Sequence, residues 1–252
     1  MQTMQHALAD HCNLKCDECS TRSPFLKKSY SELDSFKRDI ERFAPIVQVG
    51  RFEFMGGEPL LNKQVDDFIQ VVKDSGIATR IGVFTNGKLL PKMSDRFFDL
   101  IDDIMITAYP NSGIDYKKVR HWLVKKQETH NFTLSIDIKK DFFVVYKAKD
   151  DDADRVKKVF DECVIAHDWK CTQLKDGYFY RCTFPYMKHK FDGFDHTQDG
   201  VDVHSDEFPT NFYNYMRYQK PMEACKYCNA MSGPTVPHSQ IINIKEMRKN
   251  LV

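Results

Sequence analysis

Three cysteines lie close together near the start of the chain, at Cys12, Cys16 and Cys19. The spacing C-x3-C-x2-C lets three thiolates of one loop converge on a soft metal centre. A structural zinc ion takes four protein ligands, so three thiolates and an open position fit an iron–sulfur cluster with one free iron better. A zinc site completed by His11 or by a distant cysteine is the alternative.

A second stretch, Gly56-Gly57-Glu58-Pro59, follows a short apolar segment about one strand–helix unit after the cysteines. Its two glycines let the backbone approach a ligand closely, where any side chain would clash. Glu58 adds a carboxylate, and Pro59 stiffens the exit from the turn. On its own, this stretch would be explained better as an ordinary turn with an exposed glutamate.

Together the two stretches resemble the radical S-adenosylmethionine (radical SAM) enzymes. The resemblance implies that the three cysteines hold three irons of a 4Fe-4S cluster, whose fourth iron binds SAM, and that Gly56–Pro59 holds the amino group of SAM. It adds Thr85, Asn86 and Thr107 as SAM contacts, although an ordinary Gly-containing turn explains the first two equally well. Glu18 departs from the family, because many members carry an aromatic residue there that packs on the adenine.

The remaining cysteines all lie in the last third of the chain: Cys163, Cys171, Cys182, Cys225 and Cys228. Their order, with Gly177 among them and a final C-x2-C, resembles the one-cluster Twitch form of the SPASM/Twitch domain. This resemblance implies a second, auxiliary 4Fe-4S cluster. Five cysteines compete for four ligand positions, and the spacing does not choose between Cys163 and Cys171. A zinc ribbon built from the last four of these cysteines is the alternative.

The elements that position these residues alternate along the first two-thirds of the chain. Apolar periodicity predicts strands over 4–9, 51–55, 79–84, 104–107 and 132–138, and helices over 31–43, 65–73, 96–101, 114–126 and 153–162. Ser31 is the expected N-cap of the first helix. Repeated strand–helix units predict a parallel α/β sheet with its site loops at the carboxyl ends of the strands.

For the whole fold, the family resemblance implies a partial (β/α)6 TIM-like barrel over 1–148. It also implies a small cysteine-rich auxiliary-cluster domain over 149–252. The stretch between Cys182 and Cys225 is polar and is expected to be loop. The histidines, including His167 and His238, have no ligand spacing and are expected to be surface or hydrogen-bonded side chains.

Composition excludes several classes of function. The 252 residues are 42% hydrophobic and 29% charged with a net charge of +1, which gives no electrostatic reason to bind nucleic acid or an acidic membrane. No apolar run is long enough to span a bilayer, and the first ten residues lack the features of a signal peptide. The free cysteines are therefore expected to serve a metal in a reducing cytoplasm.

The resemblance implies a radical SAM oxidoreductase that cleaves SAM and abstracts hydrogen from a small polar substrate. In size and layout the chain is similar to a one-cluster family member, an aminocyclitol dehydrogenase. We therefore expect a dehydrogenase or epimerase of a carbohydrate, aminocyclitol or nucleotide-sugar, reduced by a donor such as flavodoxin or ferredoxin. A maturase of ribosomal peptides is one alternative, made less favourable by the short segment before Cys12. A non-catalytic iron–sulfur or zinc protein is the other, and no catalytic acid or base is identified.

Overall fold

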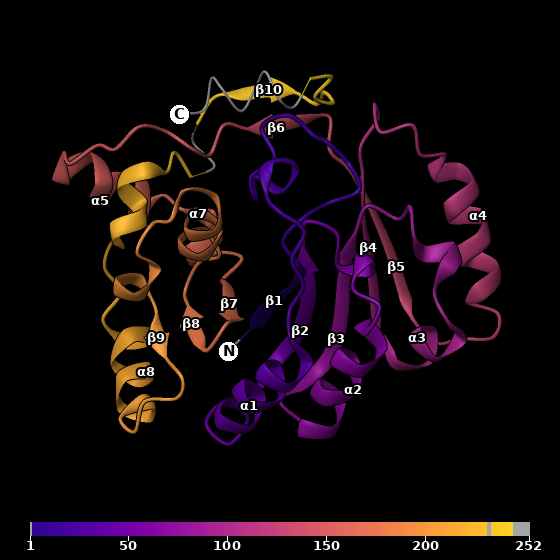
Figure 1. The fold of residues 1–252 in the computed structure, drawn as a ribbon, viewed down its shortest axis with the longest axis horizontal. Coiled ribbons are helices and arrows are strands. Elements are labelled where there is room, and N and C mark those ends of the chain that lie inside the picture. Colours follow the sequence, from indigo (N-terminus) through magenta and orange to yellow (C-terminus); the bar gives the residue numbers. More distant parts are fainter. Residues whose placement is uncertain (1, 231–232, 244–252) are drawn as a thin grey trace.

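An eight-stranded sheet organises the computed structural model, which describes residues 2–230 and 233–243 (Figure 1). The strands of this sheet run in the order β5-β4-β3-β2-β1-β7-β8-β9. Their bounds are β1 Thr3–Ala9, β2 Val49–Gly56, β3 Ala78–Thr85, β4 Asp103–Ala108, β5 Thr133–Ile138, β7 Cys171–Lys175, β8 Tyr178–Tyr180 and β9 Val201–Asp202. The helices are α1 Leu33–Phe43, α2 Val65–Ser75, α3 Asp95–Leu100, α4 Tyr116–Lys126, α5 Ala153–Asp161, α6 Val164–His167, α7 Phe184–Asp192 and α8 Phe208–Arg217.

The pairs from β5 through β1 to β7 are all parallel, whereas β8 and β9 continue the sheet antiparallel. Strands β1 to β5 follow one another in the sheet in chain order. Since each parallel crossover has the same hand, their connecting helices fall on one face. The predicted α/β fold with a mostly parallel sheet is confirmed, and the loops after β1 to β4 lie along one rim.

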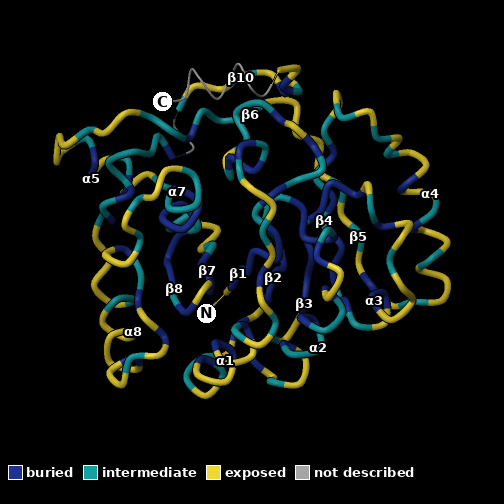
Figure 2. Tube along the Cα trace, viewed as in Figure 1, coloured by how far each residue is buried: buried dark blue, intermediate teal, exposed yellow. Residues whose placement is uncertain are grey.

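Apolar side chains at helical spacing fix the helices to the sheet. Helix α1 buries Phe36, Ile40 and Phe43, and α2 ends at Gly76, whose φ of 64° suits glycine. The predicted cap at Ser31 is wrong, because α1 begins at Leu33 and the Ser31 hydroxyl lies 2.7 Å from the His6 ring instead. In Figure 2 many residues of these strands are dark blue, which marks them as buried. The side chains of the main hydrophobic core come from these strands and the helices packed on them.

The C-terminal part does not match the expected loop between Cys182 and Cys225. This stretch contains α7 and α8, and α8 buries Phe208 and Phe212 against Phe43 and Phe179. Phe208 and Phe212 are spaced i, i+4 in an otherwise polar segment, so the sequence pattern does not indicate an apolar helix face. The rings of Phe43 and Phe179 show which side of the helix is buried. Strand β7 joins the main sheet beside β1, so that the sheet continues across the expected boundary at 148/149. The division into two domains stays a prediction.

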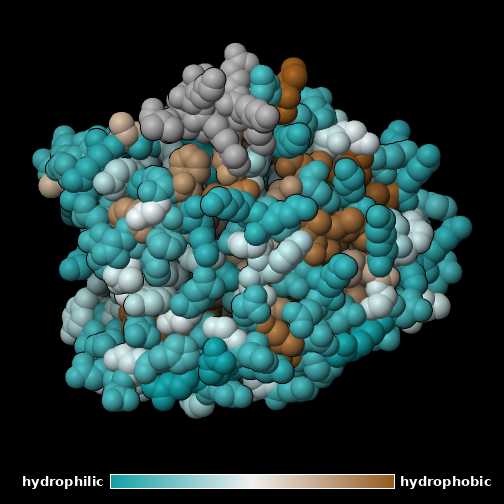
Figure 3. All heavy atoms as spheres, in the orientation of Figure 1, coloured by the Kyte–Doolittle hydropathy of each residue, from teal (hydrophilic) through white to brown (hydrophobic). Residues whose placement is uncertain are grey.

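A two-stranded ribbon crosses the rim where the site loops lie (Figure 1). It pairs β6, Asp141–Phe143, with β10, Thr235–Pro237, in antiparallel register. The face seen in Figure 3 is largely hydrophilic, and its apolar side chains gather mainly on the side of β3 to β5. None of the helices in residues 2–230 and 233–243 is both long and apolar enough to cross a membrane.

Candidate cluster and cosubstrate site

The cysteine loop and the double-glycine turn lie directly against each other. Gly57 N donates to the carbonyl of Ala9 at 2.8 Å, and Glu58 N donates to the carbonyl of His11 at 3.1 Å. A Cβ on Gly57 would come within 2.3 Å of that His11 oxygen, and one on Gly56 would meet the Ala9 oxygen equally closely. The glycines are therefore required by the neighbouring backbone, whereas the sequence had suggested an approaching ligand.

Glu58 is wholly buried, and its side chain ties two loops together. Its carboxylate accepts hydrogen bonds from Thr85 Oγ1 at 2.7 Å, Asn86 N at 2.9 Å and Leu60 N at 3.2 Å. Burial raises the pKa of Glu58 to about 7, against the opposing effect of the three donors. An exposed glutamate is thus excluded. Pro59 is buried beside it and opens a short 3-10 turn, Pro59–Leu61.

Asn86 extends this link to the cysteine loop. Its amide nitrogen donates to Asn13 Oδ1 at 2.7 Å and lies 3.8 Å from Cys12 Sγ. The predicted contacts from the loops after β1, β2 and β3 therefore meet in one hydrogen-bonded unit. Thr107 lies half-buried on β4, and within the described residues its side chain makes no hydrogen bond to that unit.

The three thiols of the loop suit a metal-bound cluster chemically. Burial raises the pKa of Cys12 to about 12 and that of Cys16 to about 11, with smaller contributions from the neighbouring thiols. Such thiols stay neutral unless a cation offsets the desolvation, and coordinated iron supplies that charge. In residues 2–230 and 233–243, no three His, Cys, Asp or Glu side chains are gathered closely enough to hold a single metal ion.

Glu18, which stands where the family resemblance implies an aromatic residue, forms an ion pair. Its φ is 50°, and its carboxylate pairs with Arg22 at 3.4 Å. The Arg22 guanidinium in turn lies 4.5 Å above the centre of the Tyr146 ring. Glu18 therefore helps to hold the end of the cysteine loop against the C-terminal half of the chain.

The segment after β10 covers the cysteine loop, and sequence reasoning missed its part in the site. Gln240 Nε2 donates to Cys16 Sγ at 3.1 Å, and a ring nitrogen of His238 lies 3.3 Å from the same sulfur. Two backbone hydrogen bonds reinforce the contact: Ile241 N donates to the Lys15 carbonyl, and Asp17 N donates to the Ser239 carbonyl. His238 is only 3% exposed. No spacing could reveal a contact between residues more than 200 positions apart.

Four of the C-terminal cysteines act electrostatically on one another, and for the fifth, Cys171, other groups contribute more. After burial, the thiols of Cys228, Cys163 and Cys225 are what raise the pKa of the Cys182 thiol. Cys182, Cys225 and Cys228 also share one small hydrophobic cluster. Cys171 lies on β7, where burial and then the Glu53 carboxylate raise its pKa to about 12, with a smaller contribution from Cys163.

A small cavity lies between the Gly56-Gly57 turn and α7. Asp10 lines it on the side of the cysteine loop, and Tyr186 and Lys190 of α7 line it on the other. Tyr186 donates to Asp10 at 3.2 Å, and Lys190 lies 3.7 Å from the same carboxylate. Gln173 also lines it, wholly buried, and its amide nitrogen and oxygen have no partner within the described residues.

Comparison with known proteins gives consistent relatives. The GTP 3',8-cyclase of Alkaliphilus oremlandii is 29% identical over 94 residues, which cover 36% of this chain and 29% of the cyclase. That of Aliarcobacter butzleri is 32% identical over 96 residues, or 37% and 29%. The predicted resemblance to the radical SAM enzymes is confirmed.

The fold of the chain is similar to that of BtrN in complex with AdoMet and 2-DOIA. The TM-score is 0.57 at 18% identity, over 92% of this chain and 94% of BtrN. This likeness supports the predicted partial barrel. No model of a protein family matches the chain. The matched stretches span less than a third of the length of the two cyclases, so the activity and substrate are matters for proposal.

Proposed function

We propose that this chain is a radical SAM oxidoreductase that dehydrogenates or epimerises a small, hydroxylated substrate such as a carbohydrate, an aminocyclitol or a nucleotide-sugar. The observation that carries the proposal is the cavity between the Gly56-Gly57 turn and α7. Its walls combine Asp10, Lys190, Tyr186 and the unpartnered amide of Gln173. Such a mixture of charged, hydroxyl and amide groups suits a polyol, whose hydroxyls donate and accept hydrogen bonds.

Cys12, Cys16 and Cys19 would hold the first 4Fe-4S cluster, with SAM at its open iron. Bound there, cluster and SAM supply a 5'-deoxyadenosyl radical able to take a hydrogen atom from an unactivated carbon. The chain orients this chemistry through the loops after β1 to β3, which Glu58 and Asn86 hold together. The backbone of the Gly56-Gly57 turn is then free to bind the amino group of SAM.

Cys163, Cys182, Cys225 and Cys228 would hold the auxiliary 4Fe-4S cluster, which supplies an acceptor for one electron. In a dehydrogenation the substrate would lose a hydrogen atom to the 5'-deoxyadenosyl radical, which yields 5'-deoxyadenosine, and then a proton to a base and an electron to the auxiliary cluster. Asp10 faces the cavity from beside the first cluster loop, and α7 faces it from immediately after Cys182. A substrate in the cavity would thereby lie between the elements that follow the two cysteine groups, and the Asp10 carboxylate is the candidate to receive the proton.

The cavity has a volume of about 20 Å³, room for roughly one water molecule. A substrate therefore requires α7 to move away from the cysteine loop. BtrN, similar in fold, is also known in an OPEN conformation, with a TM-score of 0.52 to this chain. We propose the same kind of opening here, with a cytoplasmic flavodoxin or ferredoxin as the reductant.

The test is anaerobic reconstitution with iron and sulfide, followed by incubation with SAM and dithionite. We expect 5'-deoxyadenosine from the wild-type protein and none from Cys16→Ala. A panel of aminocyclitols and sugars should then raise 5'-deoxyadenosine formation and yield a ketone or an epimer. Tyr186→Phe should lower product formation while leaving substrate-independent SAM cleavage intact. Absence of 5'-deoxyadenosine from the cluster-loaded wild type would refute the enzyme proposal.

A further inference from the structure

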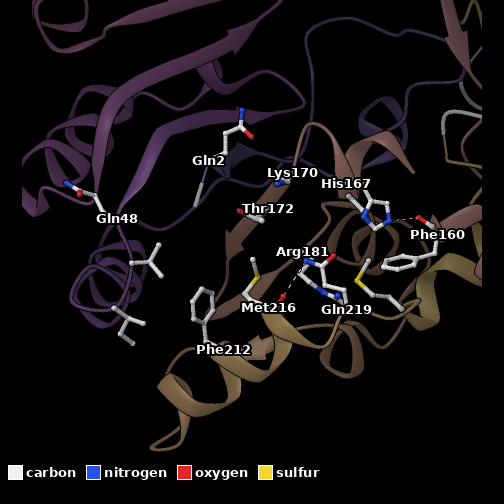
Figure 4. Close-up of a pocket in the computed structure, with 14 residues that line it drawn as sticks. Gln2, Gln48, Phe160, His167, Lys170, Thr172, Arg181, Phe212, Met216 and Gln219 are labelled. Atoms are coloured by element: carbon white, nitrogen blue, oxygen red, sulfur yellow. Dashed lines mark hydrogen bonds between the residues drawn. The ribbon is translucent and has the colours of Figure 1, made fainter. Parts of the chain in front are cut away.

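A large cavity lies at the opposite end of the sheet from the cysteine loop. It has a volume of about 720 Å³, and Figure 4 shows that its lining comes from several elements. Gln2 and Gln48 stand just before β1 and β2, Thr172 lies at the start of β7, and Phe212 lies on α8. The cavity thus lies at the amino ends of these strands. Its size is that of pockets that bind small organic molecules.

Arg181 is the feature of this cavity that calls for a ligand. It lines the wall and is only 8% exposed. Its Nη2 donates to the Lys220 carbonyl at 3.0 Å, and its guanidinium lies 4.4 Å above the centre of the Tyr215 ring. Nε and Nη1 are buried without a hydrogen-bond partner in the described part of the chain. The buried Asp199 carboxylate acts electrostatically on Arg181 but accepts no hydrogen bond from it in the described residues, and an anion that pairs with the unpaired donors would remove their cost.

The rest of the lining agrees with an anionic ligand. The described lining contains no aspartate or glutamate, and Lys170 adds a second cation at an exposed position. The remaining wall is partly apolar, with Phe160, Phe212 and Met216 among its side chains. We propose that this cavity binds a small organic anion whose carboxylate or phosphate pairs with Arg181 and whose apolar body lies against these side chains.

The proposal does not depend on the radical reaction, because the cavity lies away from the SAM loops. It is tested on the reconstituted protein by calorimetric titration with phenyl phosphate, benzoate and inorganic phosphate. We expect sub-millimolar binding of at least one aromatic anion and weaker binding of inorganic phosphate, which lacks the apolar body. The stronger of the two aromatic anions identifies the acidic group.

Substitutions distinguish this site from surface charge. Arg181→Met should weaken binding by roughly 10-fold or more, since a charge-assisted hydrogen bond is lost, and Arg181→Lys should give an intermediate effect. Lys170→Met should weaken binding less. Lys158→Met, which removes an exposed charge on α5 outside the lining, should leave it unchanged. The anion should raise the melting temperature of the wild type and not that of Arg181→Met.

Two results would overturn the proposal. The first is the absence of binding of either aromatic anion to the wild type below millimolar concentration. The second is unchanged binding by a folded Arg181→Met protein, with or without an altered spectrum of the auxiliary cluster. An altered spectrum would show that Arg181, the residue before Cys182, acts on the cluster instead of on a ligand in the cavity.

Discussion

The two groups of cysteines are assembled in different ways. Cys12, Cys16 and Cys19 occupy one short loop, which is held from outside by Gly57, Asn86 and the segment around Gln240. The auxiliary set comes from three separate stretches of the C-terminal half. The loop is predicted from its spacing together with Gly56–Pro59, whereas membership of the other set depends on which segments pack together. A site built from one loop can thus be predicted from the sequence, whereas a site built from distant segments requires the structure.

The largest test of this comparison removes each group in turn. Cys12/Cys16/Cys19→Ala should lose about four of roughly eight irons and all SAM cleavage. Replacing the four auxiliary cysteines by alanine should lose the other four irons and retain SAM cleavage to 5'-deoxyadenosine. Iron and sulfide assays, with SAM turnover, check both results. Zinc retained in the first variant in place of iron would refute the auxiliary cluster.

The second test asks which cysteine is the outlier. Cys163→Ala should lose about four irons, because this thiol interacts with each of the other three members of the set. Cys171→Ala should keep the wild-type iron content, since Glu53 and Arg51 are the neighbours that act most on its thiol. The opposite pattern would transfer the fourth ligand position to Cys171.

The third test concerns the carboxylate behind the first loop. Glu58→Gln should cost about 1–3 kcal/mol of unfolding free energy at pH 5, because one of its three donors then faces an amide N–H₂. The raised pKa of Glu58, about 7 against 4.5, means that the folded state binds the proton more tightly. Its contribution to stability therefore falls as the pH rises from about 4.5 through about 7. Relative to the wild type, the unfolding free energy of the variant should increase by up to about 3 kcal/mol between pH 5 and pH 8.

Denaturant unfolding at several pH values, without SAM, checks this expectation. Glu41→Gln is the matched control, since Glu41 is exposed on α1. A pH profile of Glu58→Gln that runs parallel to that of the wild type would contradict the assignment of Glu58 as a buried, titrating group.

The smallest expected effect tests the segment over the loop. Gln240→Ala removes an N–H donor from Cys16 Sγ, and hydrogen bonds to a ligand sulfur stabilise the reduced cluster. The reduction potential of the first cluster should fall by on the order of 40 mV, the equivalent of about 1 kcal/mol for one electron. His238→Ala should act in the same direction. Ser239→Ala, exposed between them, is the control, and an unchanged potential in Gln240→Ala would show that the contact has no effect on the cluster.

Much of the fold followed from local pattern. The five parallel strands β1 to β5 and their helices appear within a few residues of the predicted ranges, because apolar periodicity reports burial on a sheet directly. Helix α8 was not predicted, because its two buried aromatic residues, Phe208 and Phe212, lie in a polar stretch and define no apolar periodicity by themselves. Their packing partners on α1 and β8 are evident only in the structure.

The sequence by itself determined the two motifs that predict the chemistry of the first loop, because three thiols and a double-glycine turn at these spacings need no distant residue to be recognised. Only the tertiary structure decided the burial of Glu58, the contact of Gln240 with Cys16, and the position of Cys171 on β7 near Glu53. The physical reason is the range of the interactions. Spacing along a loop is fixed by the chain, whereas contacts between distant segments are fixed by packing.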